Sequence, residues 1–341
     1  MNGVTAMTFP SPAGRAAAVL PGALGPLRMT PGRWVALAVA VPVALALIAW
    51  TGFSIVAALA KGSYPFSYPV SVNRGQLAMN VDVGHITLRQ GPDGNTARLA
   101  GTVQYGLVRP DVSEASTSAG TNFGVNCSSV YDGSCNVNAT LDVPPRTAVT
   151  LSSNGGDIQA SGFSSGMTLW AGGGNVTASD LAGHLQLDTG GGDLTASGLT
   201  GDLELTAEGG NINASNLASS STMRLDTGGG DLTANGLTGD FQLTTEGGNT
   251  DAETLASQVV TVQSGGGNVT LAFTRVPENL QITAQGGNVT VILPTGGTTY
   301  DISTPGTAGG NVSIPTSLVN LGSADKITID SGGGDISVSQ S

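Results

Sequence analysis

The stretch GGGDLTASGLTGDLELTAE, residues 190–208, decides the fold expected of this chain. The apolar residues Leu194 and Ala196 alternate with hydroxyl residues, and Leu203 and Leu205 then repeat the alternation with polar neighbours. Alternation with period two is typical of half-buried strands. The stretch therefore predicts two short strands joined by a Gly-Leu-Thr-Gly corner. We expect the glycine triplet to supply positive φ angles for the sharp turn back.

The same unit recurs along the chain. A glycine pair followed by Asp or Asn occurs ten times, at steps of 18 to 24 residues. The Asp and Asn residues are Asp157, Asn175, Asp193, Asn211, Asp231, Asn249, Asn268, Asn288, Asn311 and Asp335. A period near ~20 residues is typical of solenoids, in which a single turn cannot bury its apolar face alone. The sequence predicts an all-β, β-helix-like β-solenoid of 18–24-residue coils over 154–341.

Stacking these coils in register predicts continuous core columns. The first column contains Ile158, Val176, Leu194, Ile212, Leu232, Val269, Val289, Val312 and Ile336, and the next contains Ala160, Ala178, Ala196, Ala214, Ala234 and Ala252. Thr250 interrupts the first column, and the sequence gives no reason for it. We interpret the Asp and Asn positions as a structural turn ladder, because such side chains bond to nearby backbone. No cofactor is expected; calcium is the alternative, although its G-G-x-G-x-D repeats are matched only in part.

The first 60 residues differ in character from the rest. They contain no Asp or Glu, and their basic residues are Arg15, Arg28 and Arg33. Residues 34–60 carry no charge and exceed the ~20 apolar residues that a transmembrane helix needs. The positive-inside rule then predicts a disordered cytoplasmic tail over 1–33 and an extracytoplasmic domain after the membrane. A signal peptide cleaved after Ala58-Leu59-Ala60 is the alternative.

The region between the helix and the regular repeats is less uniform. We expect a polar stalk over 61–74 and an irregular β region over 75–153 that caps the solenoid, because terminal repeats must cover an open end. The chain's two cysteines, Cys127 and Cys135, flank an Asp-Gly turn. An oxidising compartment permits a disulfide there, and two cysteines allow one intramolecular pairing.

Charge and composition exclude several functions. All 24 acidic residues lie beyond Ala60, where only nine Lys or Arg accompany them, so that part nets −15. Such a surface repels phosphate backbones, and we expect no nucleic-acid partner. His85 and His184 are far apart in sequence and are expected to be solvated strand residues, so no catalytic or metal-binding residue is assigned. Aromatic residues make up only 4% of the chain, so no sugar-stacking groove is expected.

The recurring GG-[DN]-[VIL]-T-A units and the lead-in VPPRTAVTL at 143–151 resemble a known group. It is the bacterial putative-adhesin family of β-strand repeat proteins, a domain of unknown function. The chain is also similar to the extracytoplasmic toast-rack domains associated with bacterial envelope-stress systems. The resemblance covers roughly 75–341 and implies the fold, but it supplies no catalytic residues.

The expected function is therefore a non-enzymatic, membrane-anchored cell-surface protein, adhesin-like or scaffolding. Its partner would be a surface polymer or protein, and its own helix would hold it in the cell membrane with the N-terminus in the cytoplasm. An extracytoplasmic sensor module with a membrane signalling partner is the alternative. A polysaccharide-acting β-helix enzyme is a more remote one. The final turn at 334–338 is expected to leave an open edge that could accept a partner strand.

Overall fold

The computed structural model of the chain describes residues 39–48, 50–51, 61–72, 74–82, 84–106, 109–117, 120–126, 135–306 and 309–341. The chain divides into two units, Met1–Val56 and Ala57–Ser341. In the first unit, residues 39–48 and 50–51 are helical. Within the described ranges, no helix combines the length and apolar character needed to span a membrane. The expected tail over 1–33 and part of the expected span over 34–60 lie outside those ranges.

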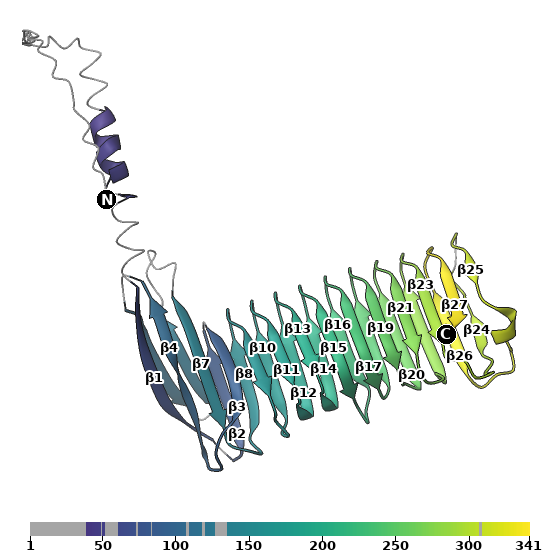
Figure 1. Ribbon diagram of the computed structural model, residues 1–341, viewed down its shortest axis with the longest axis horizontal. Coiled ribbons are helices and arrows are strands. Elements are labelled where there is room, and N and C mark those ends of the chain that lie inside the picture. Colours follow the sequence, from purple (N-terminus) through teal and green to yellow (C-terminus); the bar gives the residue numbers. More distant parts are fainter. Residues whose placement is uncertain are drawn as a thin grey trace, which may run out of the picture. The chain divides into compact units, whose positions relative to one another are not determined.

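The second unit is a β-structure whose strands hydrogen-bond in two rows (Figure 1). The first row contains, in spatial order, β5 (Asp111–Thr117), β6 (Gly120–Asn126), β2 (Gln76–Val81), β8 (Ala148–Ser153), β10 (Met167–Ala171), β12 (Ala182–Thr189), β14 (Thr200–Ala207), β16 (Met223–Thr227), β18 (Phe241–Thr245), β20 (Val259–Ser264), β22 (Asn279–Ala284), β26 (Lys326–Asp330) and β24 (Asp301–Ser303).

The second row contains β1 (Gly62–Ser71), β4 (Thr96–Tyr105), β7 (Asn136–Val143), β3 (His85–Gln90), β9 (Ile158–Ser161), β11 (Val176–Ser179), β13 (Leu194–Ser197), β15 (Ile212–Ala218), β17 (Leu232–Thr238), β19 (Thr250–Leu255), β21 (Val269–Phe273), β23 (Val289–Leu293), β27 (Ile336–Gln340) and β25 (Val312–Ser313). A 3-10 helix, η1 (Thr316–Leu318), follows β25. Each regular coil gives one strand to each row, so the all-β expectation is confirmed and a coil has two strand-bearing faces.

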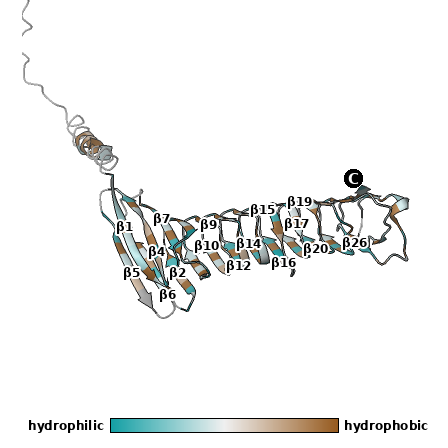
Figure 2. Ribbon diagram, turned by 60° about the horizontal axis from the view of Figure 1, so that its bottom comes forward, coloured by the Kyte–Doolittle hydropathy of each residue, from teal (hydrophilic) through white to brown (hydrophobic). Residues whose placement is uncertain are grey.

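The coils stack in parallel register with alternate side chains buried. Leu194 of β13 pairs with Val176 of β11 and with Ile212 of β15, and all three are buried in one core cluster. Figure 2 shows the resulting alternation of hydrophobic and hydrophilic residues along the strands. Because period-two side chains point to opposite faces, each strand places one set in the core and the other in solvent.

A further core column lies at the corner between the two strands of a coil. It consists of the buried residues Phe163, Leu181, Leu199, Leu217, Leu237, Leu255 and Phe273. The residue before each of the first six has a left-handed φ; these residues are Gly162, Asp180, Gly198, Asn216, Gly236 and Thr254. The left-handed residue turns the chain so that the next side chain enters the core. The sequence pattern did not predict this column, because corner leucines lie outside the alternating runs.

The expectation that the glycine triplets supply positive φ angles is wrong for the regular coils and holds only at the last triplet, where Gly332 has a φ of 64°. None of the triplet glycines between 172 and 287 has a left-handed φ. Instead, a Cβ on the glycine before each ladder residue would collide with the neighbouring coil; on Gly210 it would lie 2.0 Å from the Gly192 carbonyl oxygen. These glycines are required because the backbones of stacked coils approach too closely for a side chain.

The N-terminal end of the β unit is antiparallel. The residues expected to form a stalk, 61–74, instead contain β1, which pairs along its whole length with β4. The aromatic rings of Phe66, Tyr68 and Phe123 pack together there, with the Phe66 and Phe123 centroids 5.1 Å apart. Pro65 and Pro69 lie on the outer strand, where a missing N–H costs no internal ladder bond.

The last coils do not stack in sequence order. Strand β27 pairs with β23 on one side and β25 on the other, and β26 lies between β22 and β24 in the same way. The expected open edge at 334–338 is therefore interior, and β25 occupies the outermost position of its row. The outermost position of β25 also explains the exposure of Val312, which was expected in the core and is 44% exposed.

Candidate binding surface

The ten Asp and Asn side chains of the expected ladder lie in one hydrogen-bonded series. At each step, Oδ1 of one ladder residue accepts a bond from the backbone N–H of the next, as Asp157 does from Asn175 at 2.8 Å. The series runs Asp157, Asn175, Asp193, Asn211, Asp231, Asn249, Asn268, Asn288, Asp335 and Asn311, with distances of 2.7 to 3.0 Å. The ladder thus satisfies backbone donors and ties neighbouring coils together.

The ladder oxygens are engaged with backbone rather than arranged around a hollow. Among the described residues, no group of three or more His, Cys, Asp or Glu side chains is placed to hold a metal ion. Calcium prefers six or more oxygen ligands. The expectation that the domain needs no metal stays a prediction.

The two histidines lie on separate coils. His85 occupies the ladder position of the first coil, since Ile86 pairs with Ile158, and its Nδ1 lies 3.6 Å from Oδ2 of Asp157. His184 pairs in register with Asp202, and its Nδ1 lies 4.0 Å from that carboxylate. Both His–Asp contacts are largely exposed, so the geometry presents solvated side chains and not a catalytic pair.

Only one of the two cysteines is described. Cys135 is half-buried against the core and is disulfide-bonded. Cys127 lies outside the described residues, so the pairing of Cys127 with Cys135 stays a prediction.

Thr250, the interruption in the first core column, has a partner in the structure. Its hydroxyl oxygen lies 3.2 Å from that of Thr245, and both side chains are buried. In sister coils, the hydroxyl at the Thr245 position donates to the turn carbonyl, as Thr227 does to Gly230. The two threonines therefore satisfy each other where an apolar residue stands elsewhere.

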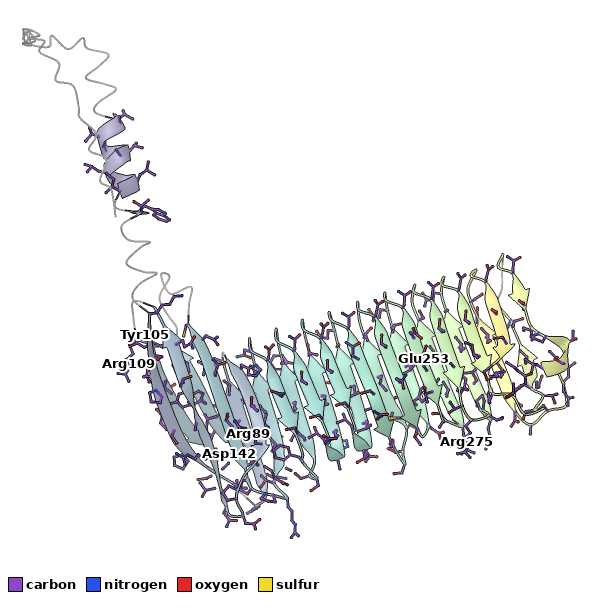
Figure 3. All side chains as sticks on the ribbon, in the orientation of Figure 1. Arg89, Tyr105, Arg109, Asp142, Glu253 and Arg275 are labelled. Carbon is purple, nitrogen blue, oxygen red and sulfur yellow. The ribbon has the colours of Figure 1, made fainter. Side chains whose placement is uncertain are left out.

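On the outward side of the first row, several acidic side chains lie close enough for their negative charges to repel one another. Burial raises the pKa of the Asp188 carboxyl, hydrogen bonds from Thr206 and Gln186 oppose this, and the charges of Glu204 and Glu208 raise it further. Figure 3 shows Arg89 and Asp142, which are register partners on β3 and β7, near the first coils, and Glu253 and Arg275 on later ones. The surface is dominated by hydroxyl and amide groups, with no strongly basic cluster among the residues that line its hollows.

Two hollows lie along the outward side of the first row. One has a volume of about 500 Å³ and is lined by Asn80, Val81, Asp82, Ser113, Ala115, Asn122, Phe123, Gly124, Ser152 and Asn154. The other has a volume of about 460 Å³ and is lined by Thr244, Thr245, Glu246, Gln263, Ser264, Gly265, Thr283 and Gln285. Between them, Trp170 projects from β10 with 40% of its surface exposed. Polar hollows of this size are large enough for small ligands.

One family model covers most of the coil stack. Residues 111–339 match the Toastrack DUF4097 model. The chain belongs to the Toastrack family. This confirms the resemblance carried by the GG-[DN] units, and the Toastrack match begins at β5, within the antiparallel end of the unit. No curated protein matches the chain.

Solved structures of similar proteins are remote from this Toastrack chain. A putative adhesin from Parabacteroides merdae is 13% identical with a TM-score of 0.41, over 81% of this chain and 96% of that chain. A putative adhesin from Bacteroides fragilis is 11% identical with a TM-score of 0.31, over 82% and 97%. A putative cell adhesion protein from Clostridium sporogenes is 11% identical with a TM-score of 0.21, over 82% and 100%.

Proposed function

We propose that this Toastrack protein is a non-enzymatic, adhesin-like or scaffolding protein of the bacterial cell surface. The apolar segment at 34–60 would anchor it in the cell membrane, with 1–33 in the cytoplasm and the β unit outside. The partner would be a polymer or a protein on another surface.

The observation that carries the proposal is the regular outward column of each row. On the second row, Thr177, Thr195, Asn213, Thr233, Asp251, Thr270 and Thr290 follow one another in parallel register. Strand spacing places such groups about 4.8 Å apart. A repeating polar array favours many weak contacts with a repeating partner, and avidity along the array can supply the binding strength.

Deletion of the gene tests the proposal. Cell attachment to a polymer-coated surface and transcription of envelope-stress genes are measured side by side in the deletion strain, and again after the full chain is restored. We expect lost attachment, unchanged transcription, and recovery with the restored chain. Unchanged attachment with altered transcription would replace the adhesin with an extracytoplasmic sensor module.

A further inference from the structure

The hollow at the start of the coil stack is lined mainly by amide and hydroxyl side chains. Strand β2 and its end supply Asn80 and Asp82, β6 supplies Asn122, and β8 and its end supply Ser152 and Asn154. The buried residues Val81 and Phe123 also line it, as do residues of β5. The hollow therefore lies at the junction of the β5–β6 hairpin with the first coils.

Hydrogen bonds between the side chains of the hollow orient their amide and carboxylate groups. Other donors and acceptors of the same side chains are left available to a ligand. The Asn80 amide nitrogen donates to Oδ1 of Asn122 at 2.8 Å, and that of Asn154 donates to Oδ1 of Asp82 at 3.2 Å. An Asn side chain offers two donors and an acceptor, and a carboxylate offers two acceptor oxygens. The amide nitrogen of Asn122 and the second carboxylate oxygen of Asp82 thus remain for a ligand, held in place by their neighbours.

An exposed indole ring lies on β10, the strand next to this hollow. Trp170 is the register partner of Ser152, which lines the hollow. A Cβ added to Gly172 would meet the Trp170 ring at 2.9 Å and the backbone oxygen of Asn154 at 2.7 Å. The ring therefore leans over the glycine turn next to Asn154. A single exposed aromatic is ordinary on a protein surface; its position beside a polar hollow is the informative feature.

We propose that this hollow and Trp170 bind a neutral saccharide chain. A pyranose ring has an apolar face of C–H groups, which can stack on an indole, and a rim of hydroxyls, which pair with amide and carboxylate groups. The inference rests on the proposed surface function and names the chemical class of its partner. It also revises the expectation that so few aromatics exclude a sugar-stacking site, because one well-placed ring is enough.

The charge of the site favours a neutral ligand. Among the described residues that line the hollow, Asp82 is the only charged one. Residues beyond Ala60 carry 24 acids against nine Lys or Arg, so an acidic polysaccharide would be repelled. Asp82 alone does not supply the pair of carboxylates that most glycosidases place on either side of one bond.

The strand edges argue against an extended peptide. Strands β2, β6, β8 and β10 are each paired on both sides, so none of them offers a free edge at the hollow. The free edge of the row belongs to β5, which is separated from Trp170 on β10 by β6, β2 and β8. Peptides that add to a sheet need such an edge.

The second hollow suggests a ligand longer than one sugar. In the outward column, Trp170 is followed in register by Asp188, Thr206, Asp226, Thr244, Gln263 and Thr283. The last three of these line the second hollow. A chain lying along the column would contact both hollows, and a hexasaccharide should therefore bind at least about tenfold more tightly than its monosaccharide.

Binding of the purified full chain to cellohexaose, maltohexaose and chitohexaose tests the proposal, with calorimetry and tryptophan fluorescence as readouts. We expect at least one of them to bind. Trp170→Ala should weaken that binding by about tenfold or more, since the stacked ring is lost. Val259→Ala, also 40% exposed and also in the first row, is the matched control and should bind normally. Thermal unfolding of both variants checks that the fold is retained.

Three results with saccharides would overturn the inference: no hexasaccharide bound, unchanged binding by Trp170→Ala, or a monosaccharide that binds as tightly as its hexasaccharide. Binding of gelatin peptides in place of every saccharide would also overturn it. If the deletion strain still loses attachment, these failures leave the surface function standing. Normal attachment in the deletion strain would instead remove the function itself.

Discussion

The glycines at the two ends of each coil have different physical roles. At the ladder turn, glycine is required because adjacent backbones touch, as at Gly210. At the opposite corner, glycine is favoured because φ is left-handed, as at Gly198 with a φ of 64°. Asp180 and Asn216 take the same corner conformation, which these two residue types tolerate better than most.

Two alanine substitutions separate close approach from conformational freedom. Gly210→Ala places a Cβ 2.0 Å from a backbone oxygen, whereas Gly229→Ala meets nothing within 4 Å and has no left-handed φ. We expect Gly210→Ala to lower the free energy of unfolding by about 3 kcal/mol or more. Gly229→Ala should raise it by up to about 1 kcal/mol. Denaturant unfolding of both variants measures the difference, and similar effects would contradict the close-approach role.

Thr254 is a strained corner residue. Its φ is 57°, which is unfavourable for a β-branched side chain, and it is exposed. Thr254→Gly should therefore stabilise the protein by about 1 kcal/mol. Thr233→Gly, at an exposed and extended strand position, should destabilise it by about 0.5–1 kcal/mol. Thermal unfolding compares the two, and a loss of stability in Thr254→Gly would be the contrary result.

Asp188 makes the free energy of unfolding depend on pH. Because burial raises the pKa of its folded-state carboxyl above the unfolded value, the folded state binds more protons between the two values, and stability falls as pH rises through them. Asp188→Asn should raise the melting temperature at neutral pH, with the gain vanishing below the ordinary pKa of 3.8. Asp251→Asn, on the exposed side of the second row, serves as control. A pH-independent gain would show that charge is not the cause.

At the scale of elements, the order of the last strands is the least expected feature. The chain leaves β23, forms β24 and β25 at the outside of the stack, and returns to insert β26 and β27 beneath them. The ladder follows the same order, because Oδ1 of Asp335 accepts from the backbone N–H of Asn311. The backbone N–H of Asp335 in turn donates to Oδ1 of Asn288. The C-terminal strand is thus an interior strand.

Engineered disulfides distinguish this order from stacking in sequence order. Thr290 pairs in register with Ser337, and Ser337 with Ser313. Adjacent strands are about 4.8 Å apart, within disulfide range, and strands two apart are about 9.6 Å apart, beyond it. The double substitution Thr290→Cys with Ser337→Cys should crosslink on oxidation, and Thr290→Cys with Ser313→Cys should not. Mass spectrometry of peptides reads the outcome, and the reverse pattern would favour sequence order.

The sequence predicted the regular strands well and the ends poorly, for a physical reason. Residues such as Leu194 and Ala196 predict a strand, because every second side chain of each regular strand is buried and must be apolar. The inserted β26 and β27 carry the same motif as any coil, so the motif cannot give their order. The aromatic β1 lacks the repeat entirely and was expected to be a stalk. Trp170 stood in the outward phase of a predicted strand, but the neighbouring hollow depends on β5 and β6 folding beside it.

At the scale of the whole molecule, the β unit combines a hydrogen-bonded ladder between coils with an exposed polar surface. Each coil is bound to the next by backbone and ladder hydrogen bonds, while its outward side chains stay available for contact. This division suits a protein that presents a surface at the outside of a cell. The proposed function therefore requires that the β unit be accessible from outside the intact cell.

Labelling of intact cells with a membrane-impermeant amine reagent measures this accessibility. The chain has two lysines, Lys61 and Lys326, and Lys326 is exposed at the start of β26. Peptide mass spectrometry of the recovered full chain should find Lys326 labelled on intact cells, and Lys326→Arg should abolish that signal alone. Labelling of Lys326 only after the cells are permeabilised would contradict the proposed location of the β unit outside the cell.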